Sequence, residues 1–458
     1  MANILYQGVR ALVMGLGLSG GGLETAKFLL SRGAVVTVTD TKNEAALAPS
    51  VDALKAFAAE HGYPVPRFVL GRHETADFEA ADMVVKNPIV HPDSPYLLAT
   101  ERASRRIESD ISLFLAENPA RLTAVSGSKG KSTTVSAIHH VLHKWHEKTG
   151  RGKAYSGGNI GFSPLSFLDT LTGDDDVVLE LSSWQLGDLR GKTDTAGNAL
   201  LVPRIAVLTA IMSDHQNWYH GMEPYVADKR VIYRYQDETC ATVTTDDDWG
   251  KRFLSETHAK KICVADAPRE LKTLAPHIPG DHNKQNLMLA GLALAELGLP
   301  LPFIVDALEQ FPGIEHRLEC FREHAGIRYY NDSAATVPEA AASALATLPG
   351  SVFITGGTDK DLDFTPLAAV CAKARAVILL AGTGTDKLTP LLAQNGVAYH
   401  GPFDTLDEAV QTAVSLAGSA SGTRPPVLFS PGCTSFGMFT NEFDRGRQFK
   451  AAIARYTG

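Results

Sequence analysis

Cysteine is scarce in this chain and widely scattered. The 458 residues include five cysteines, and no two of them stand at the spacing of a zinc site or a disulfide framework. They are Cys240, Cys263, Cys320, Cys371 and Cys433. Disulfide-stapled secreted modules and zinc fingers are therefore excluded, and this usage is typical of a cytoplasmic protein.

Three further features are missing. No uncharged apolar run is long enough to cross a bilayer. The first residues, Met-Ala-Asn-Ile-Leu-Tyr-Gln-Gly, lack the basic and apolar regions of a signal peptide. The formal net charge of −8 leaves no basic excess for nucleic acid. We therefore expect a cytoplasmic protein without membrane insertion or a nucleic-acid partner, and we further expect a monomer that acts on small molecules.

The composition is that of a globular protein, with 44% hydrophobic and 21% charged residues. The length favours about three domains. Strand and helix patterns alternate in each third of the chain, which predicts an α/β fold. We place the domains at residues 1–108, 109–313 and 314–458.

The strongest motif is Leu122-Thr-Ala-Val-Ser-Gly-Ser-Lys-Gly-Lys-Ser-Thr-Thr134. An apolar run ends in a glycine loop, and helical spacing begins at Lys131. A strand, a glycine loop and a helix N-terminus form a phosphate cradle, in which backbone N–H groups and a lysine bind the anion and a hydroxyl reaches Mg²⁺. The candidate nucleotide-binding residues are Gly127, Ser128, Lys129, Gly130, Lys131, Ser132 and Thr133.

Acidic and imidazole groups follow two later apolar runs. Glu180 lies inside Val177-Val-Leu-Glu-Leu-Ser-Ser-Trp-Gln-Leu186, and Asp214-His215 follow the run that begins at Arg204. A buried carboxylate needs a partner, because an unpaired buried charge is expensive. Mg²⁺ held near the phosphate loop would supply that partner.

A second glycine loop lies near the start of the chain. Gly15-Leu-Gly-Leu-Ser-Gly20 follows a strand pattern, and Asp40 ends the next one, twenty positions beyond the last glycine. Taken alone, this fingerprint predicts NAD with Asp40 on the ribose. An NAD-dependent oxidoreductase is therefore an alternative.

The phosphate loop has Val125 where a general P-loop has its first glycine. This shortened loop, Ser-Gly-x-x-Gly-Lys-Ser-Thr, resembles that of the Mur ligase family and its relative folylpolyglutamate synthase. Further family motifs follow in order along the chain: Gly-Asn-Ile-Gly at 158–161, Glu-Leu-Ser-Ser-x-Gln-Leu at 180–186, His-Asn-x-x-Asn at 282–286 and Asn-Asp-Ser-x-Ala-Thr at 331–336.

The resemblance is to the D-glutamate-adding branch of the family. It implies a Rossmann-like N-terminal domain, a central P-loop-type domain and a Rossmann-like C-terminal domain. It also implies an ATP-dependent, amide-forming ligase of peptidoglycan synthesis. That enzyme would add D-glutamate to UDP-N-acetylmuramoyl-L-alanine through an acyl phosphate, with two Mg²⁺ ions.

The resemblance also implies the roles of individual residues. Catalytic roles fall to Lys131, Glu180, His215, Lys229 and Arg317. The metal set is Ser132, Glu180, His215 and Lys229, the last as a carbamate. Further ATP contacts are Asn283, Asn286, Arg317 and Asp332. The residues expected to contact the UDP substrate are Gly15, Leu16, Gly17, Ser19, Asp40, Thr41, Asn87 and Asn159, with Lys86 as a further contact. The residues expected to bind the amino-acid substrate are Thr336, Lys360, Ser435 and Phe443.

Three positions depart from the family pattern. Asn217 stands in place of an acid, Ala334 in place of a lysine, and Glu442 in place of an aromatic residue. The amino-acid pocket is therefore altered, and the sequence does not decide between D- and L-glutamate. A sister ligase that uses L-glutamate or another amino acid is the alternative within the family.

Overall fold

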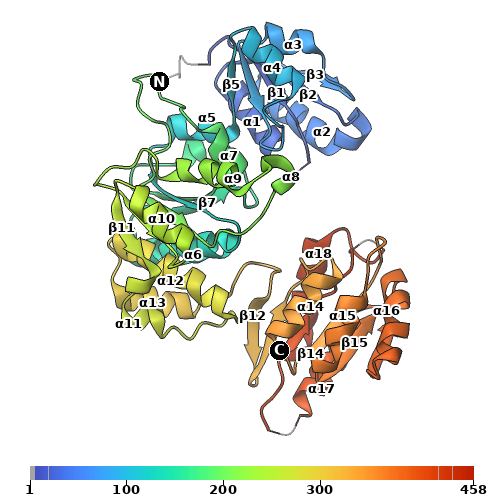
Figure 1. Cartoon of the computed structure of the whole chain (residues 1–458). Coiled ribbons are helices and arrows are strands. Elements are labelled where there is room, and N and C mark those ends of the chain that lie inside the picture. The colour runs from blue at the N-terminus through green and yellow to red at the C-terminus, as the bar shows by residue number, and fades with distance from the viewer. Residues whose placement is uncertain (1–5, 19, 421, 436) are drawn as a thin grey trace. The chain divides into compact units, whose positions relative to one another are not determined.

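The computed structural model describes residues 6–18, 20–420, 422–435 and 437–458 (Figure 1). The chain forms two compact units. One contains the chain up to Thr273 together with Gln285–Ala307, and the other contains Leu274–Lys284 and Leu308–Gly458. Both units are α/β: two parallel sheets lie in the first, and a third sheet lies in the second.

The N-terminal sheet has five parallel strands in the order β3-β2-β1-β4-β5. The strands are β1 (Arg10–Met14), β2 (Val35–Asp40), β3 (Arg67–Leu70), β4 (Met83–Lys86) and β5 (Arg106–Glu108). The helices are α1 (Gly21–Ser31), α2 (Glu44–His61), α3 (Thr75–Ala80) and α4 (Pro95–Arg102). The strand order reverses between β1 and β4, and ligands of open α/β sheets bind at the carboxyl ends of strands at such a point.

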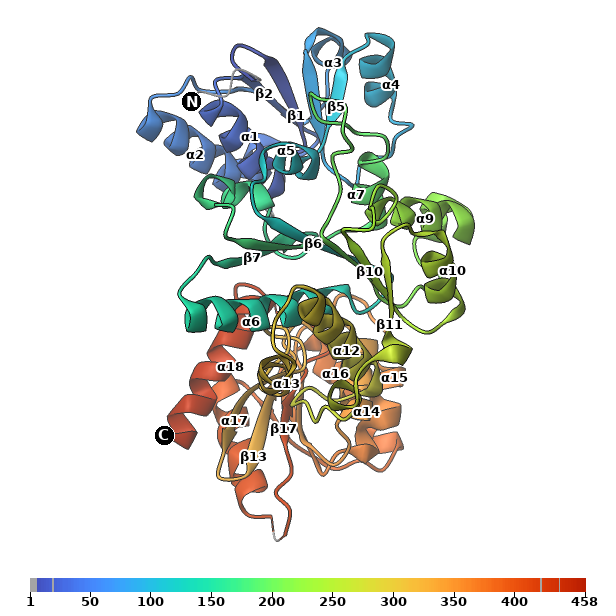
Figure 2. The same cartoon turned by 90° about the vertical axis from the view of Figure 1, so that its left-hand side faces the viewer.

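The central sheet has six parallel strands in the order β11-β10-β9-β6-β8-β7. The strands are β6 (Arg121–Ser126), β7 (Ala154–Gly158), β8 (Asp176–Glu180), β9 (Ile205–Leu208), β10 (Ala241–Thr244) and β11 (Lys260–Cys263). Helix α6 (Lys131–Thr149) packs on β6, β7 and β8 (Figure 2). The phosphate loop joins β6, in the middle of this sheet, to α6.

The other helices around the central sheet are shorter. They are α5 (Asp110–Glu117), α7 (Ser183–Asp188), α8 (Gln216–Tyr219), α9 (Met222–Lys229), α10 (Asp248–Glu256), α11 (Arg269–Lys272), α12 (Asp281–Glu296) and α13 (Leu301–Glu309). Single 3-10 turns are η1 (Pro164–Ser166), η2 (Leu168–Thr170), η3 (Arg230–Ile232) and η4 (Val264–Asp266). Helix α12 crosses from one compact unit to the other.

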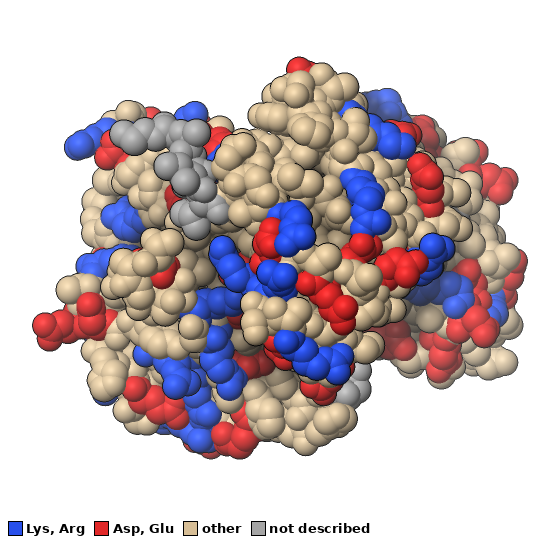
Figure 3. Space-filling view, turned by 90° about the horizontal axis from the view of Figure 1, so that it is seen from above, with Lys and Arg blue, Asp and Glu red and all other residues tan. Residues whose placement is uncertain are grey.

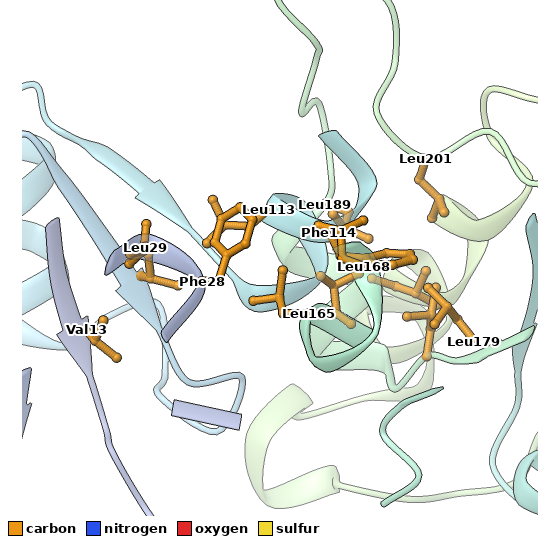
Figure 4. Packing of buried hydrophobic residues seen from close by; sticks show 14 of the residues in the cluster. Val13, Phe28, Leu29, Leu113, Phe114, Leu165, Leu168, Leu179, Leu189 and Leu201 are labelled. Atoms are coloured by element: carbon orange, nitrogen blue, oxygen red, sulfur yellow. The ribbon is translucent and has the colours of Figure 1, made fainter. Parts of the chain in front are cut away.

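One apolar core joins the two sheets of the first unit (Figure 4). Side chains of β1 and α1 meet side chains of α5, η1, η2 and β8 in it. The buried residues labelled in the figure are Val13, Phe28, Leu29, Leu113, Phe114, Leu165, Leu168, Leu179, Leu189 and Leu201. Each such side chain stabilises the fold by about 1.5–3 kcal/mol when fully buried. Arg32 adds ion pairs to Glu117 at 2.8 Å and to Asp169 at 2.6 Å.

The C-terminal sheet has the order β12-β13-β17-β14-β15-β16, with β12 and β13 antiparallel and the other pairs parallel. The strands are β12 (Glu319–His324), β13 (Ile327–Asn331), β14 (Val352–Gly356), β15 (Ala376–Leu380), β16 (Tyr399–Phe403) and β17 (Val427–Phe429). The helices are α14 (Pro338–Thr347), α15 (Thr365–Val370), α16 (Thr383–Gln394), α17 (Leu406–Gly418) and α18 (Glu442–Thr457), with the 3-10 turn η5 (Cys371–Lys373). The carboxyl ends of the neighbours β13, β17 and β14 therefore meet at one edge.

The α/β architecture predicted from the sequence is confirmed. The domain limits at 108 and 313 stay a prediction, since the compact units divide the chain differently. No helix within the described residues is long and apolar enough to cross a membrane. On the face drawn in Figure 3, basic and acidic side chains are interspersed, so that face carries no field of a single sign.

Candidate functional site

The phosphate loop has a backbone that only glycine fits at two positions. Gly127 has φ +148°, and a Cβ there would lie 1.9 Å from Thr209 Oγ1. Gly130 has φ +94°, and a Cβ there would lie 2.3 Å from Asn286 Oδ1. The loop is thus wedged between Thr209, beyond the end of β9, and Asn286 of α12. This close approach brings the predicted ATP residue Asn286 against the loop.

We expect Gly127→Ala to lower the free energy of unfolding by about 2–4 kcal/mol, because backbone strain at positive φ adds to the clash with Thr209. The matched control is Gly150→Ala at the other end of α6. Gly150 has φ +68° and open space around its Cβ position, so strain alone should cost about 1 kcal/mol. Urea unfolding measures both variants, and equal losses would contradict the clash.

Side chains outside the motif hold the loop in place. Thr209 Oγ1 donates to Lys129 O at 2.7 Å. Ser128 Oγ accepts from Met212 N at 2.9 Å and lies 2.8 Å from Tyr225 Oη. Our sequence analysis gave Thr209 and Tyr225 no role. Thr209 was detectable in principle, because it follows a buried strand at the same sheet edge.

Two lysine amines, that of half-buried Lys131 and that of buried Lys229, converge on one carbonyl of the loop. Lys131 Nζ donates to Gly127 O at 3.0 Å and to Ser128 O at 3.1 Å. Lys229 Nζ, from the end of α9, donates to Gly127 O at 2.7 Å, and Lys229 is only 1% exposed. Burial lowers the pKa of both amines, and the charge of Lys131 contributes to lowering that of Lys229 to about 7. A substantial fraction of the Lys229 amine is therefore neutral at physiological pH.

Glu180 lies at the end of β8 and is 2% exposed. Its Oε1 accepts a hydrogen bond from Asn159 Nδ2 at 2.8 Å. Its Oε2 is buried and has no hydrogen-bond partner in the part of the chain that the structure describes. The Gly158 backbone lies close to the Glu180 carbonyl, because a Cβ on Gly158 would be only 2.2 Å from Glu180 O. The Gly-Asn-Ile-Gly turn thus fixes this carboxylate from one side.

His215 follows β9 with φ +50°, a left-handed conformation that is uncommon for residues other than glycine. Its N–H donates to Asp214 Oδ1 at 3.0 Å. Its ring centroid lies 4.5 Å from that of Trp184 and 6.4 Å from that of Tyr225. The imidazole therefore has one aromatic neighbour from α7 and another from α9.

The residues present fit Mg²⁺. The orphaned Oε2 of Glu180 is a hard oxygen donor, which Mg²⁺ prefers, and Ser132 supplies a hydroxyl at the start of α6. Within the described residues no cluster of three His, Cys, Asp or Glu side chains forms a ready metal site. The predicted metal ligands are Ser132, Glu180, His215 and Lys229. This set therefore depends on the hydroxyl of Ser132 and on a carbamate of Lys229 as additional ligands, and it stays a prediction.

The N-terminal glycine loop is organised by Asp40. Asp40 Oδ2 accepts from Gly17 N at 3.1 Å, and its Oδ1 accepts from Lys42 N at 2.9 Å. Gly15 N donates to Thr39 O at 2.8 Å, and a Cβ on Gly15 would lie 3.3 Å from Asn87 Cβ. The structure thus brings Gly15, Gly17, Asp40 and Asn87 together at the carboxyl ends of β1, β2 and β4.

The other predicted UDP residues differ from one another in their exposure to solvent. Thr41 is exposed, whereas Leu16 is 1% exposed and part of the core, so only its backbone faces outward. Ser19 lies outside the described residues. A Cβ on Gly22 would lie 2.1 Å from Gly15 O. Gly22 is therefore needed for the close packing of α1 on the loop.

Lys86, which we predicted as a further UDP contact, pairs with a carboxylate of α7, and its contact with UDP stays a prediction. Its Nζ lies 2.7 Å from Asp188 Oδ2 and donates to Val90 O at 3.2 Å, and the side chain is 6% exposed. Asp188 ends α7, and burial raises its pKa to about 6. Lys86 thus links the N-terminal sheet to α7, a contact that neither sequence segment reveals alone.

The predicted amino-acid residues come from loops after neighbouring strands. Thr336 follows β13, Ser435 follows β17, and Lys360 follows β14. Ser435 is buried, Thr336 is half-buried and Lys360 is exposed. Phe443, in α18, is 52% exposed, and its ring lies 6.0 Å from that of His316.

Asp332 is buried beside these loops, and both of its carboxylate oxygens accept hydrogen bonds. Its Oδ2 accepts from Ser430 Oγ at 2.6 Å, and its Oδ1 accepts from Leu318 N at 3.0 Å. Burial raises the pKa of Asp332 to about 6. Arg317 is exposed beside Leu318. In α12, Asn283 Nδ2 donates to Pro279 O at 2.7 Å.

Arg445 holds the same loops together and was missed in the sequence. It is 1% exposed, and its guanidinium donates to Ser333 Oγ, Ser333 O, Cys433 O and Thr434 O at 2.7–3.0 Å. A Cβ on the next residue, Gly446, would lie 2.2 Å from His316 Nδ1. The Arg-Gly pair in α18 was the available signal.

Two family models match the chain. Residues 9–108 match the Mur ligase MurD-like N-terminal domain, and residues 125–273 match the Mur ligase middle domain. The first match includes the Gly15 loop, and it favours the ligase over the NAD-dependent oxidoreductase that this loop also allowed. Both matched ranges lie within the first compact unit, which carries both glycine loops.

Whole-chain relatives agree with these matches. The UDP-N-acetylmuramoylalanine–D-glutamate ligase of Treponema pallidum (strain Nichols) is 40% identical, over 99% of this chain and 98% of its own. The enzyme of the same name from Roseiflexus sp. (strain RS-1) is 38% identical, over 98% and 99%.

Solved structures agree in fold. MurC of Thermotoga maritima has a TM-score of 0.51 at 18% identity, covering 98% of this chain and 99% of its own. MurF of Acinetobacter baumannii has a TM-score of 0.52 at 14% identity, covering 84% and 93%. Together with the domain matches and the full-length relatives, this likeness establishes that the chain belongs to the Mur ligase family.

Proposed function

We propose that this protein is an ATP-dependent ligase that adds D-glutamate to UDP-N-acetylmuramoyl-L-alanine, in the cytoplasm, as a step of peptidoglycan precursor synthesis. It acts as a monomer on small molecules, without nucleic acid or membrane insertion. The names of the relatives support the substrates. The observation that carries the mechanism is the convergence of Lys131 and Lys229 on Gly127 O beside the unpaired oxygen of Glu180.

The phosphate loop binds the triphosphate of ATP. The first N–H groups of α6 have no partner within the helix and point at the anion. Lys131 exchanges its loop carbonyls for phosphate oxygens and follows the negative charge during transfer. Asn283, Asn286, Asp332 and Arg317 complete the nucleotide side in this proposal.

The UDP substrate lies along the loops of the N-terminal sheet. Asp40 and the Gly15 loop bind the uridine diphosphate, and Asn159 orients the muramoyl arm. A carboxylate oxygen of the alanyl group attacks the γ-phosphorus, the bond to the β-phosphate oxygen breaks, and ADP leaves. Correct placement of the carboxylate supplies much of the rate enhancement, because the two reactants no longer have to meet by diffusion.

D-glutamate enters on the C-terminal sheet. Lys360 binds its carboxylates, Ser435 and Thr336 donate hydrogen bonds, and Phe443 forms one wall. The glutamate amine, after losing a proton, attacks the acyl carbon. The tetrahedral intermediate then expels inorganic phosphate, and the amide remains.

The neutral amine of Lys229 reacts with CO₂, which forms a carbamate and releases one proton. Ser132, Glu180, His215 and the carbamate of Lys229 would hold two Mg²⁺ ions. When bound, Mg²⁺ supplies charge neutralisation at the phosphate oxygens. The unpaired Oε2 of Glu180 and the lowered pKa of Lys229 support this set.

The test is phosphate release from ATP with UDP-N-acetylmuramoyl-L-alanine and D-glutamate, L-glutamate, L-alanine or no amino acid. We expect release that depends on D-glutamate and falls at least about 10³-fold in Lys131→Ala, since that amine stabilises the transferring phosphoryl group. Lys148→Ala, at the exposed end of the same helix, should retain wild-type activity. Preference for L-glutamate would change the substrate, and no release with any amino acid would overturn the ligase.

A further inference from the structure

Four aromatic rings form a column beside the phosphate loop. His91 and Trp218 have ring centroids 4.3 Å apart, Trp218 and Trp184 are 4.9 Å apart, and Trp184 and His215 are 4.5 Å apart. These separations are those of interacting aromatic pairs. We name this set, His91–Trp218–Trp184–His215, the aromatic column. It lies entirely within the first compact unit.

The two ends of the column lie at two different ligand loops. His91 belongs to the segment after β4, four residues beyond Asn87, and the neighbouring Val90 O accepts from Lys86. At the other end, the His215 ring faces that of Tyr225, whose hydroxyl contacts Ser128 of the phosphate loop. The column therefore joins the UDP side of the site to the phosphate side.

The Trp184 side chain meets its neighbours in the column through ring contacts, whereas Trp218 N also donates to His215 O at 2.9 Å. The indole Nε1 of Trp184 is buried and has no hydrogen-bond partner among the residues that the structure describes. Trp184 and Trp218 are both partly exposed, and His91 is exposed. A column held by ring contacts, without a hydrogen bond to lock Trp184, responds to a displacement at either end.

His215 needs such support. Its φ of +50° is a conformation that other residue types than glycine keep only when their surroundings impose it. The ring of Trp184 lies 4.5 Å from the imidazole and the ring of Tyr225 lies 6.4 Å from it, so Trp184 is the closer of these two neighbours. A change in the tilt of Trp184 therefore changes where the imidazole points.

We propose that Trp184 and Trp218 are positioning residues that couple occupancy of the N-terminal glycine loop to the orientation of His215. The inference rests on the proposed function, because it takes the UDP substrate as the ligand of that loop. Binding of this substrate displaces the His91 segment, the two indoles follow, and His215 turns toward the phosphate loop. The phosphate side thus becomes competent only when the acceptor is present.

The chain offers a direct readout, because it has four tryptophans. Trp184 and Trp218 lie in the column, whereas Trp145 packs on Phe303 and Trp249 stacks on Phe253. The full-length protein is titrated with UDP-N-acetylmuramoyl-L-alanine, without ATP or metal, while emission is recorded and binding is followed by calorimetry. We expect a saturable emission change whose midpoint matches the calorimetric one. The Trp184→Phe/Trp218→Phe double variant should lose it, each of the two single variants should keep part of it, and Trp145→Phe and Trp249→Phe should keep it in full.

Activity supplies the second readout. Trp218→Leu should lower kcat about tenfold or more with the KM for ATP unchanged, because misplacement of a reacting group by about an ångström is costly. Trp218→Phe retains a ring and should restore most of that loss. A change in KM for ATP alone, or equal kcat in the Leu and Phe variants, would overturn the coupling.

The outcomes separate the inference from the function on which it rests. Calorimetric binding without an emission change, or a change that survives in the Trp184→Phe/Trp218→Phe double variant, overturns the coupling and leaves the ligase intact. No calorimetric binding of the UDP compound overturns the proposed function itself. Matching circular dichroism of all variants excludes misfolding as the cause of a lost signal.

Discussion

Replacing Lys229 with methionine should abolish ligase activity while raising the stability of the unliganded protein at pH 7. We expect phosphate release to fall at least about 10³-fold, since the amine proposed to become a metal-holding carbamate is gone. We expect the free energy of unfolding at pH 7 to rise by about 2–4 kcal/mol.

The stability gain follows from the buried amine. Burial, together with the nearby charge of Lys131, lowers the pKa of Lys229 to about 7, against about 10.4 for an exposed lysine. Between these two pH values the unfolded chain holds a proton that the folded protein has released. Holding this amine in the fold therefore costs about 4–5 kcal/mol at pH 7. Methionine removes that cost, and Gly127 O still accepts from Lys131.

The sign of the pH dependence is a further check. Because the unfolded state binds more protons from pH 7 to about 10.4, the stability of the wild type rises with pH across this window. The advantage of Lys229→Met should therefore shrink as pH rises and vanish near pH 10.4. Urea unfolding in CO₂-depleted buffer without Mg²⁺ measures it.

The control for this experiment is Lys251→Met, at an exposed position of α10. Lys251 is 62% exposed and pairs with Asp246 at 3.3 Å, an arrangement that contributes about 0–1 kcal/mol. Its stability difference from the wild type should be small and nearly independent of pH between 7 and 10.4. A Lys229→Met variant that is less stable than the wild type at pH 7 would contradict a neutral buried amine.

Local patterns predicted most of the elements that carry the site. The apolar run before Gly127 and the helical spacing after Lys131 correspond to β6 and α6. Glu180 ends a wholly buried strand, as expected from its apolar neighbours. These predictions succeeded because the strands are short, apolar and bounded by glycine or polar residues, so the local sequence decides their conformation.

Contacts between segments distant in the sequence were not predictable in this way. Thr209 wedges against Gly127, Lys86 pairs with Asp188, and Arg445 reaches Ser333. Each pair is joined by the order of strands in a sheet or by packing between layers. A single sequence contains the two partners but not the fact that they meet.

The other large effect concerns the C-terminal sheet. We expect Arg445→Ala to lower the free energy of unfolding of the second unit by about 3–5 kcal/mol, and Arg445→Lys by about 2 kcal/mol. Alanine leaves three backbone carbonyls and the Ser333 hydroxyl without their donor, in a space vacated by a large side chain. A single ammonium group cannot reach all four acceptors, so lysine restores only part.

Removing the buried charge of Arg445 also recovers some free energy, but less than the lost contacts cost. Burial lowers the pKa of Arg445 to about 10, so holding this charge in the fold costs about 3 kcal/mol, and alanine relieves that cost. Each orphaned buried acceptor costs about 1–3 kcal/mol, and an unfilled cavity adds to the sum. The lost hydrogen bonds and packing therefore outweigh the relief. Urea unfolding followed by near-UV circular dichroism measures the difference.

The loops that Arg445 holds carry the proposed amino-acid contacts, so replacing Arg445 should also change the binding of D-glutamate. Ser435 is one residue from Thr434 and Thr336 is three from Ser333, so both proposed amino-acid contacts lose their anchor in Arg445→Lys. We expect the KM for D-glutamate to rise about tenfold or more, and the KM for the UDP substrate to stay the same. Arg447→Ala is the matched control, because Arg447 lies on the same helix, is 63% exposed and pairs with Asp444 at 3.9 Å. Equal shifts in both Michaelis constants would mean that Arg445 supports the fold as a whole, whereas a shift confined to glutamate ties the buried guanidinium to the amino-acid pocket.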